Sequence, residues 1–180
     1  MKKLAIIASV VAAFTGINAA QAASTGTINF TGELTASTCN VSVDGQGAEA
    51  TVVLPTVSTS QLTTANQVAG STGFNMALSN CSGTLKTVSA FFEAGPSVDL
   101  VTGHLKNVSG DAGMVSLELL DGSNAMAPIK AGNTSQAIST TYVNAASGSA
   151  TLPYAVQYYA DGETTPGTVI SNVVYSIQYK

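Results

Sequence analysis

The chain has 180 residues, of which 45% are hydrophobic and 9% are charged, and this length fits a single domain. Six lysines, no arginine and ten acidic residues give a formal net charge of -4, which provides no basic surface for a nucleic acid. One histidine and two cysteines are too few for the usual zinc sites, so we expect no metal and no cofactor.

The first 22 residues have the order of a secretory signal peptide. Lys2 and Lys3 precede an apolar run from Leu4 to Phe14, and the small-residue sequence 20–22 (Ala-Gln-Ala) follows. The alternative is an N-terminal membrane anchor, but the apolar run is too short for one. We therefore predict cleavage after residue 22, which would remove two of the six lysines and change the net charge from -4 to -6.

Export would place Cys39 and Cys81 in an oxidising compartment. There, two cysteines form a disulfide far more often than a metal or redox site, so we expect a bridge between them. In the chain-entropy view, closing a loop of this length stabilises the fold by roughly 4 kcal/mol.

Strand signals recur along the rest of the chain, with turn residues between them and no convincing apolar stripe of helical period. A short helical turn over 65–69 is a minor alternative. Alternating or β-branched runs predict strands at 28–34, 51–54, 74–78, 85–92, 114–120, 152–158 and 169–179. Segments at this spacing favour two packed antiparallel sheets, the immunoglobulin-like class of β-sandwich, in one domain.

The two ends of this predicted domain carry the functional signal. Residues 26–34 are extended in character and place Ile28, Phe30, Gly32 and Leu34 on one face. A glycine inside a strand marks a bulge or the close approach of another backbone, although a first strand can also tolerate one. The C-terminal run 169–179 alternates up to the penultimate residue and would be an exposed, adhesive edge in a monomer.

These features occur in a characteristic order. A signal peptide is followed by the glycine-containing segment, by Cys39 and, about forty residues later, by Cys81; Gly167 is fourteenth from the end and Tyr179 is penultimate. In this order and spacing the chain resembles the pilins of the chaperone–usher pathway, and most of all the major subunits of type 1-like fimbriae. The resemblance covers essentially the whole mature chain.

The resemblance implies an all-β fold, an incomplete immunoglobulin-like β-sandwich that lacks its last strand and is completed by a donor strand from another subunit. A periplasmic chaperone first fills the open groove, and at the outer-membrane usher the N-terminal extension of the next subunit replaces it. The product is a structural subunit of a fimbria, exported through the periplasm to the bacterial surface, that supports cell adhesion.

Carried over to this sequence, the resemblance implies a signal peptide at 1–22, a donor-strand extension at 23–34 and a pilin domain at 35–180. The donor residues are Ile28, Phe30, Gly32 and Leu34. The groove and chaperone-binding residues are Gly167, Val169, Val173, Tyr175, Ile177, Tyr179 and Lys180. The extension before Cys39 is short, which leaves the donor register open by two residues.

Other functions have weaker support in the sequence. His104 follows Gly103 in a predicted loop and is interpreted as a surface residue, and the acidic residues show no paired spacing, so we expect no enzyme. Tyr154 and Tyr158 suggest a sugar platform, but such tyrosines more often pack a sheet with their hydroxyls at the rim. The remaining alternatives are a minor tip or adaptor pilin and a secreted glycan-binding β-sandwich.

Overall fold

The computed structural model describes residues 26–34 and 36–180. The predicted signal peptide 1–22 lies outside these residues, as does the beginning of the predicted donor extension. Contacts divide the chain into Met1–Glu33 and a compact unit, Leu34–Lys180. Each of the two parts is described here by itself.

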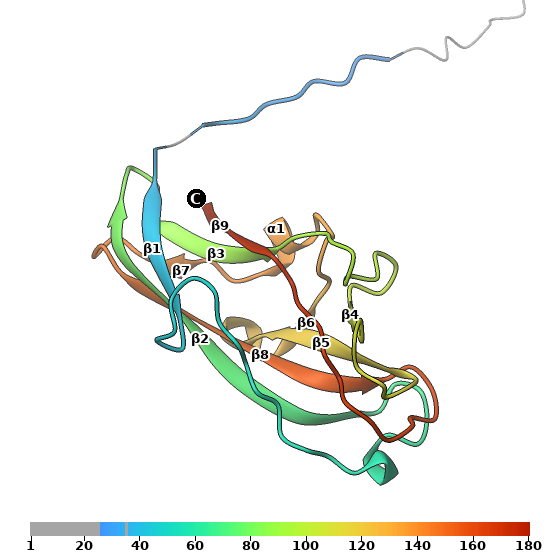
Figure 1. The fold of residues 1–180 in the computed structure, drawn as a ribbon. Coiled ribbons are helices and arrows are strands. Elements are labelled where there is room, and N and C mark those ends of the chain that lie inside the picture. The colour runs from blue at the N-terminus through green and yellow to red at the C-terminus, as the bar shows by residue number, and fades with distance from the viewer. Residues whose placement is uncertain (1–25, 35) are drawn as a thin grey trace, which may run out of the picture. The chain divides into compact units, whose positions relative to one another are not determined.

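The larger sheet of the compact unit has the strand order β1-β2-β8-β5-β4, and β6 also pairs with β5 (Figure 1). All of its pairs are antiparallel. Its strands are β1 (Thr38–Val43), β2 (Val68–Ser82), β4 (Leu105–Lys106), β5 (Val115–Asp121), β6 (Ala127–Ile129) and β8 (Ala150–Ala160).

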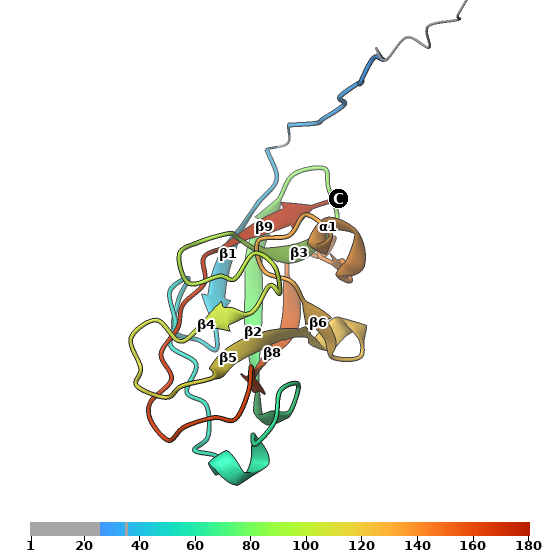
Figure 2. The ribbon, with the colours of Figure 1, turned by 90° about the vertical axis from the view of Figure 1, so that its right-hand side faces the viewer.

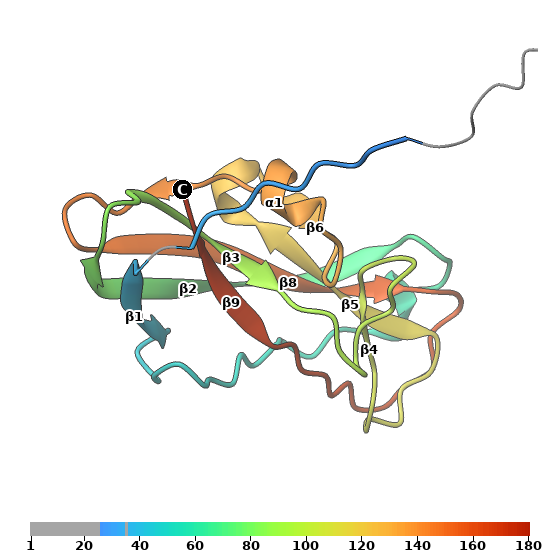
Figure 3. The same cartoon turned by 90° about the horizontal axis from the view of Figure 1, so that it is seen from above.

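The smaller sheet has the order β7-β3-β9 and is also antiparallel. Its strands are β3 (Thr87–Phe92), β7 (Val143–Asn144) and β9 (Tyr175–Tyr179). Figure 3 looks down on β3 and β9, with β2 and β8 of the larger sheet behind them. Three short helical segments connect the strands: η1 (Thr59–Gln61), η2 (Gly122–Asn124) and α1 (Gln136–Ser139).

The core lies between the two sheets, where alternate apolar side chains of facing strands meet. Its buried members include Phe74, Met76 and Leu78 of β2, Leu152, Tyr154 and Val156 of β8, and Val88, Ala90 and Phe92 of β3. The Tyr154 and Phe92 rings meet edge to face with centroids 5.2 Å apart. The predicted all-β sandwich is therefore confirmed, and the expected disulfide between Cys39 of β1 and Cys81 of β2 is present.

Several predicted elements differ from the structure. Residues 51–54 form no ladder, and the C-terminal strand is regular only from Tyr175 rather than from Val169. The minor alternative of a helical turn over 65–69 is wrong, because β2 begins at Val68. The strands β4, β6 and β7 are only two or three residues long, too short to show an alternating pattern. Among the described residues, no helix has the length and apolar character needed to cross a bilayer.

Candidate functional site: an open strand edge at the C-terminus

The last strand, β9, pairs with β3 on one side only, because it is at the end of its sheet. The N–H of Lys180 donates to the carbonyl of Thr87 over 2.8 Å, and the N–H of Thr87 donates back to the carbonyl of Lys180 over 2.9 Å. In an antiparallel ladder, such hydrogen-bonded pairs alternate with pairs whose backbone groups point away from each other. Tyr175, Ile177 and Tyr179 therefore direct their N–H and C=O groups to the open side of β9.

The same alternation continues upstream of β9, where the chain is extended but forms no regular ladder. The backbone carbonyls at the even-numbered positions point to the β3 side and accept hydrogen bonds from residues 93–112. The carbonyl of Thr168 accepts from Ala112 N–H, and that of Ile170 accepts from Val108 N–H. The carbonyl of Asn172 accepts from the Ser97 hydroxyl, and that of Val174 accepts from Glu93 N–H. The odd-numbered positions from 169 to 173 consequently face the other side. We call residues 169–179 the open edge, since their odd-numbered backbone groups form one continuous unpaired row.

The side chains of the open edge are only partly covered. Five apolar residues pack against the core but remain only half-buried: Val169, Val173, Tyr175, Ile177 and Tyr179. Their counterparts on β3, in contrast, are fully covered, with 1% of Val88, 1% of Ala90 and 2% of Phe92 exposed. The inward row is thus an apolar groove along the edge of the sandwich. Burial also raises the pKa of the Tyr175 hydroxyl, which donates to the carbonyl of Ala48 over 2.7 Å.

The beginning of the open edge is fixed by Asp111 and Gly167. One Asp111 carboxylate oxygen, Oδ1, accepts hydrogen bonds from the N–H and hydroxyl of Thr168. These bonds lower the pKa of the Asp111 carboxyl. Gly167 adopts φ +156°, and a Cβ there would collide with the backbone of Asp111 and Ala112. Gly167, predicted as a groove residue, therefore contributes a close backbone approach and no side chain.

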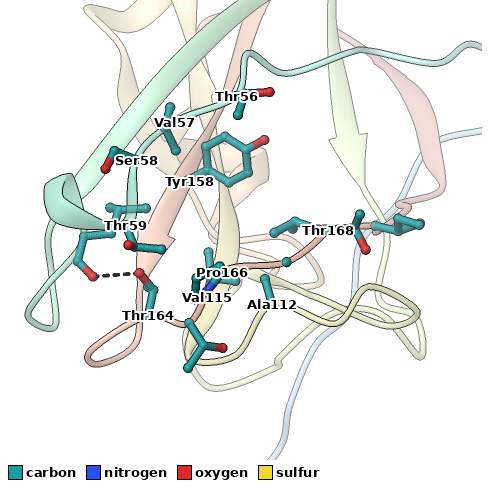
Figure 4. A pocket seen from close by; sticks show the side chains of 15 residues that line it. Thr56, Val57, Ser58, Thr59, Ala112, Val115, Tyr158, Thr164, Pro166 and Thr168 are labelled. Atoms are coloured by element: carbon teal, nitrogen blue, oxygen red, sulfur yellow. Dashed lines mark hydrogen bonds between the residues drawn. The ribbon is translucent and has the colours of Figure 1, made fainter.

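A pocket of about 610 Å³ opens beside this end of the open edge. Figure 4 shows Tyr158, Val57 and Val115 around it, together with the Pro166 segment that leads into the edge. Desolvation by burial raises the pKa of the Tyr158 hydroxyl. The mainly apolar lining gives this end of the groove room for a large apolar side chain.

The other end of the edge is fixed by the side chain of Lys180. Its ammonium group donates to the carbonyl of Ala137 over 3.0 Å and lies 3.8 Å from the centroid of the Tyr142 ring. The Tyr142 hydroxyl donates to Gln178 Oε1 over 2.9 Å. These contacts are made on the far side from the groove, so they hold the C-terminus without filling the open edge.

The N-terminal segment 26–34 is described as extended chain with every residue exposed. Ile28 is 77% exposed, Phe30 88% and Leu34 102%. A Cβ at Gly32 would meet nothing within 4 Å. A row of large apolar side chains in water is unfavourable.

His104 is not the surface residue that the sequence indicated. It precedes β4 beside β5 (Figure 2), is 9% exposed and stacks on Tyr159 at a ring distance of 4.2 Å. Its Nε2 lies 3.6 Å from a carboxylate oxygen of Glu118, and its Nδ1 lies 3.3 Å from the hydroxyl of Ser116. The sequence could not show this cluster, because its two partners come from a strand that is adjacent only in the folded sheet. Across the described residues, no group of three or more acidic, histidine or cysteine side chains could hold a metal ion.

The family model described as type-1 fimbrial protein, A, matches residues 54–180. The chain belongs to this family of fimbrial proteins. This pilin is 43% identical over 161 residues to the major fimbrial subunit SMF-1 of Stenotrophomonas maltophilia, covering 87% of this chain and 94% of that protein. It is 36% identical to the F17 fimbrial protein of Escherichia coli over the full length of both chains.

The solved structures support the fold. The pilin superimposes on the P pilus rod subunit PapA with a TM-score of 0.60 at 17% identity, over 79% of this chain and 99% of that chain. Together with the family match, this makes the protein a structural subunit of a surface fimbria that polymerises with other pilin subunits.

Proposed function

We propose that this pilin polymerises by donor-strand exchange, in which residues 23–34 of one subunit add a strand to the open edge of the next. The open edge itself supports the proposal most directly. Its odd-numbered residues present unpaired backbone groups and half-buried apolar side chains along the same line. Such an edge is completed by a strand with alternating apolar residues, and Ile28, Phe30 and Leu34 provide that alternation.

The energetics of this joint are favourable. Burying three large apolar side chains contributes roughly 5 to 9 kcal/mol before the cost of ordering the segment, and ladder hydrogen bonds add to it. Donor and acceptor lie at opposite ends of the same chain, so the contact between subunits is heterologous. A heterologous contact that does not close into a ring generates a filament.

Before assembly, the same edge requires a temporary occupant. An exposed apolar groove with unpaired backbone groups invites non-specific pairing. We infer that a periplasmic chaperone fills it during export, with Gly167 to Lys180 as its contact region, and that the outer-membrane usher is where the donor segment takes over. The similarity to the major subunit SMF-1 supports assignment as the main shaft component rather than a minor tip or adaptor pilin.

The donor assignment can be tested in full-length chains expressed with their native export machinery. Ile28→Asp combined with Phe30→Asp places two charges in the groove, and we expect surface fibres to disappear from electron micrographs. Thr27→Asp with Asn29→Asp is the matched control, because it adds the same charges to the opposite face of the segment. Fibres of normal length from the first variant would exclude this segment as the donor.

The chaperone assignment has its own test. Ile177→Asp with Tyr179→Asp damages the acceptor edge, so we expect little subunit in periplasmic extracts. Ile170→Asp with Val174→Asp is the control, because it adds the same charges to exposed side chains on the outward face of the open edge. If both pairs of substitutions gave equal recovery, the open edge would not be the surface that is protected during export.

A further inference from the structure

The inward row of the open edge contains one polar residue, Ser171. Exposure alternates regularly through this region, with 169, 171 and 173 half-buried and 170, 172 and 174 exposed, so the Ser171 side chain belongs to the groove row. Within the described part of the chain, Ser171 Oγ is the buried side-chain polar atom without a hydrogen-bond partner. A buried hydroxyl without a partner has lost its hydrogen bonds to water and has no bond that replaces them, which is unfavourable. A hydrogen-bond acceptor placed beside Ser171 Oγ would therefore be stabilising.

The donor row contains one interruption as well. Ile28, Phe30 and Leu34 are large and apolar, whereas Gly32 between them has no side chain. A glycine in a strand lets another part of the chain approach its backbone closely. The carbonyl oxygen at such a position has two lone pairs, so it can accept a ladder hydrogen bond and one more from a hydroxyl group.

We propose that Ser171 sets the register of the joint by lying opposite Gly32 of the neighbouring subunit, where its hydroxyl donates to the donor backbone. The inference rests on the proposed donor-strand exchange. An antiparallel donor, like every strand pair in both sheets, then places Leu34 opposite Val169, beside the pocket of about 610 Å³. Phe30 lies opposite Val173 and Ile28 opposite Tyr175.

The neighbouring registers are disfavoured by the same hydroxyl. A shift of two residues in one direction puts Leu34 over Ser171, and a shift in the other direction puts Phe30 there. With either large apolar side chain opposite it, the hydroxyl stays buried without a partner, so these registers lack the hydrogen bond that the Gly32 register adds. One polar atom thus distinguishes three registers that the apolar pattern alone leaves nearly equivalent.

Cross-linking in assembled fibres tests the register without changing Ser171 or Gly32. Full-length chains carry Ile28→Cys together with Val173→Cys, Tyr175→Cys or Ile177→Cys, and covalent ladders are measured on non-reducing gels. Directly opposed residues have the Cα spacing that a disulfide requires, so we expect the Tyr175→Cys pair to cross-link at least about tenfold faster than the other two. Ile28→Cys alone is the control.

The outcomes separate the two proposals. Fastest cross-linking at Val173→Cys or Ile177→Cys would overturn the Ser171 register while leaving donor-strand exchange intact. Fibres that form normally but cross-link in no register would overturn donor-strand exchange itself.

A second measurement is the rate at which fibres dissociate in denaturant, and Ser171→Ala raises this rate only if the Ser171 hydroxyl has a partner in the fibre. If Ser171 donates to the donor strand, Ser171→Ala speeds dissociation of fibres in denaturant by about fivefold, equivalent to one hydrogen bond. If the hydroxyl stays unpaired in the fibre, as it is in the free subunit, the same substitution leaves the dissociation rate unchanged. Gly32→Ala should weaken fibres more in the chain that keeps Ser171 than in the chain that carries Ser171→Ala. Gly26→Ala is the control. Equal effects of Gly32→Ala in the two chains would contradict the contact between Ser171 and Gly32.

Discussion

The hydroxyl of Tyr154 accepts a hydrogen bond from the N–H of Ala90 over 3.0 Å, joining the larger sheet to the smaller one inside the core. The strand β7 pairs with β3 only at Thr87 and Val88, so it does not reach Ala90. A side chain of the opposite sheet therefore supplies the partner that this amide lacks.

Tyr154→Phe should consequently destabilise the sandwich although it removes only the hydroxyl group from the core. The substitution leaves the buried Ala90 N–H unpaired, at a cost of about 1 to 3 kcal/mol. Thermal unfolding of purified fibres measures the change. Tyr159→Phe is the matched control, because the Tyr159 hydroxyl bonds to Asn66 in an exposed position and its loss should change the melting temperature little.

Removal of the disulfide should lower the amount of subunit that accumulates. Cys39→Ser with Cys81→Ser frees the edge strand β1 from β2 and removes roughly 4 kcal/mol of stabilisation in the chain-entropy view. Immunoblots of periplasmic extracts, with and without the substitutions, measure the loss. Unchanged accumulation at growth temperature would show that the ladder between β1 and β2 suffices by itself.

Acid should loosen the beginning of the open edge before it unfolds the sandwich. Hydrogen bonds from Thr168 lower the pKa of Asp111 in the folded state, so this carboxylate stabilises the fold above its ordinary pKa. That contribution is lost as the pH falls from the ordinary carboxyl range through the lowered pKa. Hydrogen exchange at residues 167–170 should rise over this range, and Asp111→Asn should flatten the dependence.

Gly167→Ala should prevent fibre assembly by displacing the segment that leads into the groove. The added Cβ would collide with the backbone of Asp111 and Ala112, and φ +156° disfavours any residue with a side chain. Gly95→Ala adds the same methyl group where a Cβ meets nothing within 4 Å. Counts of fibres per cell for the two variants give the comparison, and equal counts would contradict a structural requirement at Gly167.

The sequence located part of each long strand, because 74–78 and 152–158 alternate and 85–92 and 114–120 are rich in β-forming residues, but it found only 74–78 of the much longer β2. The alternation at 175, 177 and 179 predicted the strand β9 for the same reason. The alternation upstream of Tyr175 was also correct, but the sequence could not show that long-range bonds from residues 93–112, rather than a ladder, hold that part extended.

Other features depended on contacts that sequence spacing does not reveal. The cluster around His104 forms only when β4 and β5 meet, and the missing partner of Ser171 Oγ is a property of three-dimensional packing. Tyr154 was expected to pack a sheet with its hydroxyl at the rim. Its hydroxyl instead lies in the core, because an unpaired amide of the opposite sheet is there to be satisfied.

The division of the C-terminal segment into even and odd positions has a mechanical consequence. The even-numbered residues from 168 to 180 are hydrogen-bonded within the subunit. The proposed donor strand, which pairs with the odd-numbered residues, would therefore attach to a segment that is already fixed along its length. With the proposed donor strand in place, a pull directed along the paired strands would load this joint in shear, so that its ladder bonds share the force. A rod built from such joints should resist traction far better than one whose bonds could be peeled apart singly.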